Sequence, residues 1–125
     1  EKLLFVTNVQ SNDVSIIDID KNKEIDRIKV EKKPYCVAFS SDGKKAFVTN
    51  QYSDSVSVID VNSRFLEKNL RIGAFPEGID SHGGFIYVVN WMDEELVIFN
   101  EKNYKKFEVL QLGSNPRNFG KFILW

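Results

Sequence analysis

Residues 47–50 read Phe-Val-Thr-Asn, and residues 57–60 read Ser-Val-Ile-Asp. The first tetrapeptide occurs unchanged at residues 5–8 and returns as Tyr-Val-Val-Asn at residues 87–90, while residues 15–18 repeat the second motif as Ser-Ile-Ile-Asp. A proline lies 26 residues after the motif asparagine in every copy, at Pro34, Pro76 and Pro116. Landmarks held in register over shifts of 42 and 40 residues establish an internal repeat.

Each repeat contains four segments with the composition of short β-strands. In the middle copy these segments are residues 35–39, 45–49, 55–61 and 67–72. Valine and isoleucine total 24 residues and phenylalanine 10, against three alanines, and branched and aromatic side chains favour strands over helices. The fourth segment carries more charge, as do its equivalents at residues 24–30 and 106–112, which is typical of an outer edge. The sequence therefore predicts an all-β protein.

The inner strands carry apolar residues on both faces, as in Leu-Leu-Phe-Val at residues 3–6. Both faces of each sheet must then be covered, and the neighbouring repeat is the available cover. Small, twisted four-stranded antiparallel sheets stacked face to face around an axis form the blades of a β-propeller. A solenoid of repeats is the alternative architecture.

The motifs at residues 47–50 and 57–60, with Val-Ala-Phe-Ser and Asp-Gly between the proline and the first motif, resemble the YVTN β-propeller repeat. This repeat occurs in archaeal surface-layer proteins, bacterial periplasmic propellers and relatives of haem- or quinone-linked enzymes. The third copy departs from it at Val89 and Asn100 and in a shorter turn at residues 81–84. The resemblance implies a propeller fold and a periplasmic or cell-surface location.

The number of repeats is too small to close a ring. We expect one partial β-propeller domain over residues 1–125, with repeat equivalents at 1–33, 34–75 and 76–115 and the first strand of a next blade at 116–125. Propellers usually contain four to eight blades, so three blades leave two apolar faces exposed.

Two arrangements would cover these faces. Copies of the chain could assemble head to tail, with residues 118–125 of one copy pairing with residues 3–7 of the next, so that two copies form six blades. Alternatively, the chain is part of a larger propeller whose other blades lie elsewhere or on a partner subunit.

Composition limits the partners. With 17 basic and 18 acidic residues, the net charge of −1 provides no field for binding nucleic acid or anionic lipid. No apolar run approaches the roughly 18 residues of a membrane helix. One cysteine, Cys36, excludes an internal disulfide and a cysteine-based zinc site. Protein is the expected partner, either through self-association or as a partner subunit.

Residues that could carry catalysis are few. The sequence contains no Ser-His-acid pattern, phosphate-binding glycine loop or metal-spaced carboxylate set, so no catalytic, metal or cofactor residue is predicted. His82 is the one histidine and is expected to be a turn residue. The resemblance to haem-binding nitrite reductase propellers suggests the alternative that it is an axial haem ligand. Asp18, Asp60 and the motif asparagines are expected to cap turns.

A group of candidate binding residues lies at one end of the sheets, where the loops between second and third strands meet the links between blades. The candidate binding residues there are Lys33, Tyr52, Glu77, Trp91, Asp93, Glu94 and Arg117. Tyrosine, tryptophan and arginine dominate recognition surfaces, although Trp91 could equally pack against a neighbouring blade.

We therefore expect a non-catalytic, extracytoplasmic propeller module for protein binding or scaffolding. One alternative is a segment of a propeller enzyme that holds a haem or quinone-linked redox centre. Another is a structural cell-surface repeat.

Overall fold

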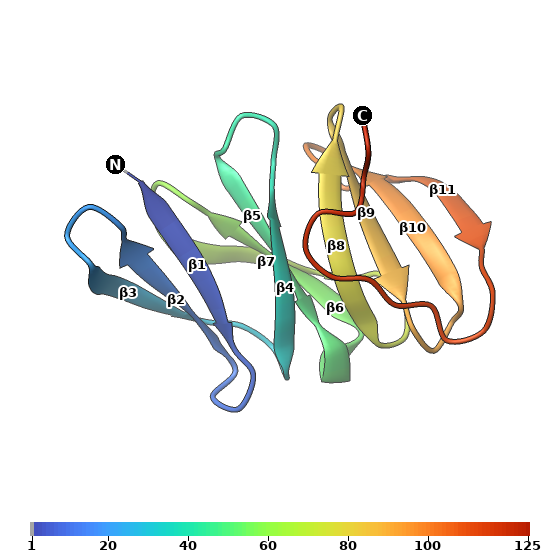
Figure 1. The fold of residues 1–125 in the computed structure, drawn as a ribbon, viewed down its shortest axis with the longest axis horizontal. Helices are drawn as coiled ribbons and strands as arrows, with labels where there is room; N and C mark the ends of the chain where they lie inside the picture. Colours follow the sequence, from blue (N-terminus) through green and yellow to red (C-terminus); the bar gives the residue numbers. More distant parts are fainter. Residues whose placement is uncertain (1) are drawn as a thin grey trace.

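The computed structural model describes residues 2–125 and contains three antiparallel sheets that fan out side by side (Figure 1). The first sheet is formed by β1 (Leu3–Asn8), β2 (Asp13–Asp18) and β3 (Lys23–Lys29). The second is formed by β4 (Pro34–Phe39), β5 (Lys45–Asn50), β6 (Ser55–Asp60) and β7 (Phe65–Arg71). The third is formed by β8 (Pro76–His82), β9 (Phe85–Asn90), β10 (Glu95–Asn100) and β11 (Lys106–Gln111).

Equivalent strands pair in the same register in all three sheets. Phe5 lies opposite Ile16 in the first sheet, and Phe47 lies opposite Val58 in the second. Each sheet is an antiparallel meander in which consecutive strands are neighbours. These are propeller blades, which confirms the prediction of an all-β fold made of four-stranded units. Within residues 2–125, the first blade has no counterpart of the inner strands β4 and β8.

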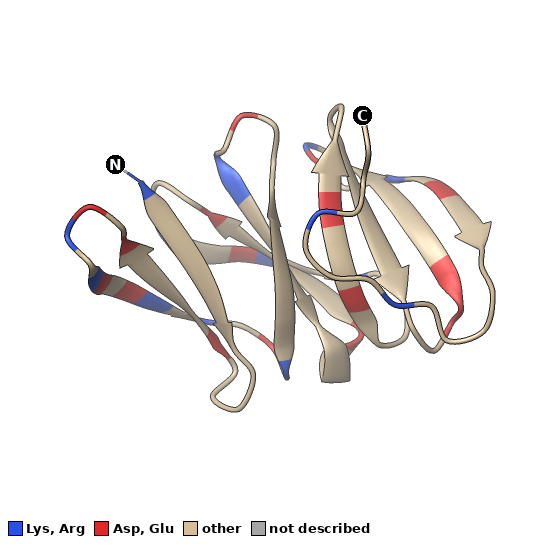
Figure 2. Ribbon diagram, viewed as in Figure 1, with Lys and Arg blue, Asp and Glu red and all other residues tan. Residues whose placement is uncertain are grey.

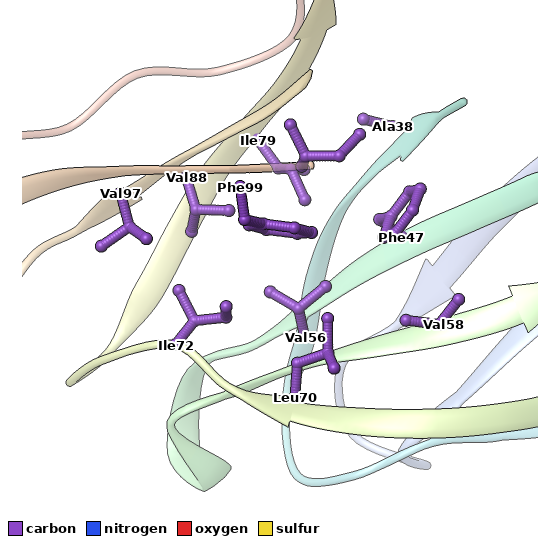
Figure 3. Close-up of a cluster of buried hydrophobic side chains, with 11 residues drawn as sticks. Ala38, Phe47, Val56, Val58, Leu70, Ile72, Ile79, Val88, Val97 and Phe99 are labelled. Carbon is purple, nitrogen blue, oxygen red and sulfur yellow. The ribbon is translucent and has the colours of Figure 1, made fainter. Parts of the chain in front are cut away.

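The core lies between the blades rather than inside a single sheet. One cluster joins the first and second blades and includes Phe5, Ile16 and Val48. A second cluster joins the second and third blades, where Phe47 meets Phe99 with ring centroids 5.8 Å apart (Figure 3). Alternate side chains of β5 therefore enter different clusters, which explains why its sequence is apolar on both faces.

The threonine of the Phe-Val-Thr-Asn motif joins neighbouring blades. Thr7 Oγ1 donates a hydrogen bond to the carbonyl of Tyr35 at 2.9 Å, and Thr49 Oγ1 donates to the carbonyl of Glu77 at 2.8 Å. Tyr35 and Glu77 are equivalent residues of the inner strands β4 and β8. The third copy has Val89 at this position, and valine cannot donate such a bond.

We expect Thr49→Val to lower the free energy of unfolding by about 1 kcal/mol, because the buried carbonyl of Glu77 loses this donor while the side-chain volume stays similar. Urea unfolding followed by circular dichroism measures the change. Val89→Thr makes the reverse change at the equivalent buried position of the third blade, and it should not stabilise the protein, because a buried hydroxyl without an acceptor costs free energy. An unchanged stability of Thr49→Val would contradict this role.

The motif asparagines and aspartates have the structural roles predicted from the sequence. Asn50 Nδ2 donates to the hydroxyls of Ser55 and Ser57 at 3.1 and 2.8 Å, which ties the two ends of the β5–β6 loop. Asp60 Oδ1 accepts the backbone N–H of Ser63 at 2.9 Å, and this bond is the first cause of the lowered pKa of Asp60. The turn-capping prediction is thereby confirmed for Asn50 and Asp60, and for Asn8 and Asp18 in the first blade, whereas Asn90 donates to the carbonyl of Ile72 at 3.4 Å instead of to its own loop.

The predicted first strand at residues 116–125 is not formed. This segment is irregular and crosses β8 (Figure 1). Its backbone N–H groups at Phe122 and Ile123 donate to Asp80 Oδ2 at 2.9 and 3.1 Å. The physical reason is that a propeller's inner strand pairs with the second strand of its own blade, and no strand among residues 2–125 pairs with residues 116–125.

The two outer blade faces are open, as the repeat count predicted. Leu4 and Val6 of β1 are 46% and 37% exposed, whereas Ala46 and Val48 at the same repeat positions are fully buried against the first blade. At the other end, Leu110 of β11 is 44% exposed, whereas its equivalent in the second blade, Leu70, is 9% exposed. Figure 2 shows β1 without charged residues after its start, in contrast to the charged strand β3. Among the residues described, no helix is long and apolar enough to cross a membrane.

Candidate functional site

The loops at one end of the blades have a repeated backbone geometry. Two repeat positions in these loops have φ near +60° in every copy. The first position is occupied by Asn12, Asp54 and Glu94. The second directly precedes the repeat proline and is occupied by Lys33, Phe75 and Asn115. The side chain of each residue of the first set accepts the backbone N–H of the residue 21 positions later, at 3.0 to 3.2 Å. Each loop is therefore fixed to the link that leads to the next blade.

This geometry lines up three aromatic side chains at the end of the second and third blades, near the short 3₁₀ helix η1 (Gln51–Ser53) in the lower part of Figure 1. The Tyr52 and Phe75 rings are 5.5 Å apart, and the Phe75 and Trp91 rings are also 5.5 Å apart. Tyr52 is exposed, while Phe75 and Trp91 are half-buried. Such tilted pairs hold the rings in fixed positions, so the rings would lose little conformational entropy when a partner binds.

Arg117 continues this row. Its guanidinium lies 6.0 Å from the Trp91 ring centre, within cation–π range. Its Nε and Nη2 each donate to Glu77 at 2.8 Å, which is a two-point carboxylate contact. The hydrogen bonds from Arg117 to Glu77 raise the pKa of Arg117. We call Tyr52, Phe75, Trp91 and Arg117 the aromatic row.

Glu77 is fully buried beneath the row and anchors it. Besides Arg117, Gln51 Nε2 donates to Glu77 Oε2 at 2.9 Å. Burial raises the pKa of the neighbouring Tyr35, and the charge of Glu77 raises it further. Glu77 acts on the surface by positioning Arg117, because a carboxylate with no exposed surface cannot itself contact a partner.

Four of the seven predicted binding residues therefore form one connected group, and the other three have local structural contacts. Asp93 Oδ2 accepts the backbone N–H of Ala74 at 2.7 Å, and Glu94 holds the next link as described above. Lys33 lies at the link between the first and second blades, where its carbonyl accepts the Gln51 N–H at 3.0 Å and its Nζ lies 3.3 Å from Gln10 Oε1. All seven lie at the same end of the blades, but Lys33 stands outside the aromatic row.

Sequence reasoning missed Phe75 and Gln51. The Phe75 ring lies between those of Tyr52 and Trp91. The sequence could have identified it, because Phe75 directly precedes Pro76 in the segment between two blades, and that segment was already predicted to lie at this end of the blades. Gln51 follows the motif asparagine, and its pairing with Glu77 crosses from one blade to the next. A single repeat contains no signal for a contact of this kind.

His82 is the last residue of β8 and pairs with Phe85, so it is the first residue of the β8–β9 turn that Gly83 and Gly84 complete. Its ring centre is 5.1 Å from that of Trp125, and the His82 side chain is exposed. The hollow beside it is lined by Ser41, Ser81, Gly83, Glu101, Lys121 and Trp125. Haem pockets are mainly apolar, so this polar lining does not fit a porphyrin. Within residues 2–125, no three His, Cys, Asp or Glu side chains are grouped to hold a metal ion.

The arrangement of the aromatic row is suited to binding. It offers aromatic side chains and one guanidinium, which are residue types that dominate protein-recognition surfaces.

Comparison with solved structures shows the same fold. Kuenenia stuttgartiensis hydrazine synthase superposes with a TM-score of 0.87 at 24% identity over 94% of this chain. Apo AztD from Citrobacter koseri superposes with a TM-score of 0.80 at 14% identity over 94% of this chain. The dihydro-heme d1 dehydrogenase NirN in complex with DHE superposes with a TM-score of 0.75 at 20% identity over 86% of this chain. The chain spans 34%, 35% and 24% of those chains, respectively.

These identities are low, so the likeness establishes the fold alone. No curated protein matches the chain. A family model described as YNCE-like beta-propeller matches residues 1–84, which include the first two blades and the start of the third. The chain therefore belongs to the YNCE-like β-propeller family.

Proposed function

We propose that this chain is a non-catalytic segment of a β-propeller that binds another protein through the aromatic row. The observation that carries the proposal is the side-by-side placement of Tyr52, Phe75, Trp91 and Arg117 at one end of two blades. Residues of these types supply most of the binding energy in protein interfaces when they are held rigidly.

Hydrogen bonds to buried and loop carboxylates hold the aromatic row in place. The buried carboxylate of Glu77 holds Arg117 by two hydrogen bonds. The carboxylates of Asp54 and Asp93 accept the backbone N–H groups of Phe75 and of the preceding Ala74. A partner would therefore lose less entropy in ordering these groups than on a flexible loop. The extracytoplasmic location is part of the proposal and rests on the resemblance to surface-layer and periplasmic propellers.

Additional blades are also part of the proposed function. The chain covers about a third of solved propeller chains, and both outer faces expose residues that are buried at equivalent positions. Such faces are stable in water only when other blades cover them.

The binding role can be tested by photo-crosslinking in cells that make the full chain. A benzophenone amino acid at Tyr52 should give an adduct of discrete mass with a second protein. The matched control is the same group at Phe65, an exposed aromatic residue on the outer strand β7, which should give no such adduct.

Trp91→Ala should reduce the Tyr52 adduct at least about tenfold, since removing a central aromatic contact typically costs more than 1.4 kcal/mol of binding. Equal adducts from Tyr52 and Phe65, or a Tyr52 adduct unaffected by Trp91→Ala, would refute binding through this surface.

A further inference from the structure

A hollow lies between the second and third blades, at the end opposite the aromatic row. It is formed where the β4–β5 turn and the start of β5 face the β10–β11 turn of the next blade, and Figure 2 shows charges of both signs on the β4–β5 turn. Its volume is about 300 Å³, which suits a small molecule. The charged residues that line this inter-blade hollow are Asp42, Lys44, Lys45, Glu67, Glu101 and Lys102.

The junction between the first and second blades has different residues at the same corner. Three apolar side chains pack against the core there, namely Leu3, Ile25 and Val61. The residues at the same three repeat positions of the next junction are charged, namely Lys45, Glu67 and Glu101. Charged groups at a contact between blades cost desolvation free energy that apolar side chains do not. The repeat itself therefore does not require these charges, and they indicate a role specific to this junction.

An ion pair and an aromatic ring form one side of the inter-blade hollow. Lys45 Nζ donates to Glu67 Oε2, and the Tyr104 hydroxyl donates to the same oxygen at 3.1 Å. The hydrogen bond from Lys45 to Glu67 raises the pKa of Lys45, so this ammonium group stays charged. The Tyr104 ring packs edge-on against Phe47 with centroids 6.2 Å apart and is half-buried. The hollow therefore has a fixed aromatic wall beside a neutralised ion pair.

The carboxylates of the hollow have hydrogen-bond partners, whereas two of its ammonium groups do not. Asp42 Oδ1 accepts the backbone N–H of Lys44 at 3.0 Å. Glu101 is 3% exposed, and its two oxygens accept the backbone N–H and the hydroxyl of Ser41. Within residues 2–125, the exposed Nζ groups of Lys44 and Lys102 form no hydrogen bond or ion pair. The donors that are free to meet a ligand are therefore cationic.

We propose that the inter-blade hollow binds a small organic carboxylate, with its carboxylate held by Lys44 and Lys102 and its apolar body against the Tyr104 ring. Lys45 is neutralised by Glu67, so the attraction for an anion comes from the two lysines at the rim. The half-buried ring favours an organic ligand over an inorganic anion. This site is separate from the aromatic row and does not rest on the proposed binding of a protein there.

Three probes of similar shape and different charge test the proposal: benzoate, benzamide and benzylammonium. Each is titrated into the ¹⁵N-labelled chain while the backbone amide chemical shifts are followed by NMR. Benzoate should shift the amides of Lys45, Lys102 and Tyr104 saturably, whereas the neutral and cationic probes should leave them unchanged. Raising the salt concentration from about 0.1 to about 1 M should weaken benzoate binding, because exposed charges are screened.

The Lys44→Gln/Lys102→Gln double variant should weaken benzoate binding at least about threefold, which is in line with the modest strength of exposed ion pairs. The matched control is Lys105→Gln, which removes an exposed lysine of the same β10–β11 loop that does not line the hollow, and it should bind benzoate as the parent does.

Lys45→Leu/Glu67→Ile introduces the residues of the first junction and should abolish the benzoate shifts in a protein that still melts cooperatively. If this replacement unfolds the chain, the substitutions at the exposed Lys44 and Lys102 still decide the question.

Three outcomes would overturn the proposal: no saturable shift with benzoate, equal shifts with all three probes, or unchanged benzoate binding after Lys44→Gln/Lys102→Gln. The Tyr52 photo-adduct reports on the opposite end of the blades, so failure of either proposal leaves the other standing.

Discussion

Val48→Asp is expected to abolish stable folding of the chain, with a loss of at least about 4 kcal/mol in the free energy of unfolding. Val48 is fully buried between the first and second blades, where it packs with Phe5, Ile16 and Ile59. An aspartate there would place a carboxylate among apolar side chains with no hydrogen-bond donor to satisfy it. Circular dichroism and thermal melting of the purified variant measure the effect.

Val6→Asp is the matched control, because it makes the same change at the same motif position of the first copy. Val6 lies on the open face of β1, where a charge stays hydrated. We expect its melting temperature to stay within a few degrees of the parent. Comparable losses in the two variants would contradict the placement of the blades.

Phe47→Ala is expected to lower the free energy of unfolding by about 3–5 kcal/mol, since it removes a large buried ring and leaves a cavity. Phe47 is fully buried and makes an edge contact with the ring of Phe99 at a centroid distance of 5.8 Å (Figure 3). It makes a second edge contact with the ring of Tyr104 at 6.2 Å. Urea unfolding gives the midpoint and slope from which the loss is obtained.

Tyr87→Ala makes the corresponding change in the third blade. Tyr87 is half-buried on the open face, so less apolar contact is lost, and the destabilisation should be clearly smaller than in Phe47→Ala. If Tyr87→Ala were the more destabilising of the two, the assignment of buried and open faces would be wrong.

The repeat explains why the fold could be predicted in detail. Repeated copies of one pattern give two or three independent observations of each strand, and the strands that form differ from the expected ones by one or two residues at their ends, whereas the strand expected at residues 116–125 does not form. The turn roles of Asp60 and Asn50 were predicted for the same reason: a residue that recurs every 42 positions serves the repeat.

The binding surface was predicted less completely. The repeat placed Tyr52, Trp91 and Arg117 at one end of the blades, but their contacts run between blades. The φ of +59° at Phe75, which brings its ring between Tyr52 and Trp91, depends on the hydrogen bond from its N–H to Asp54. The burial of Glu77 depends on Gln51 of the preceding blade.

The course of residues 116–125 shows the limit most clearly. Their repeat position predicts a strand, but a strand exists only where another strand offers its unpaired backbone groups. Here the segment lies across β8 and bonds to Asp80 instead. The spacing of apolar residues and prolines is local, and it was enough to specify blades and their register. Which faces stay open, which rings meet and where the last segment lies depend on neighbours that are distant in sequence, so the three-dimensional packing of the blades decided them.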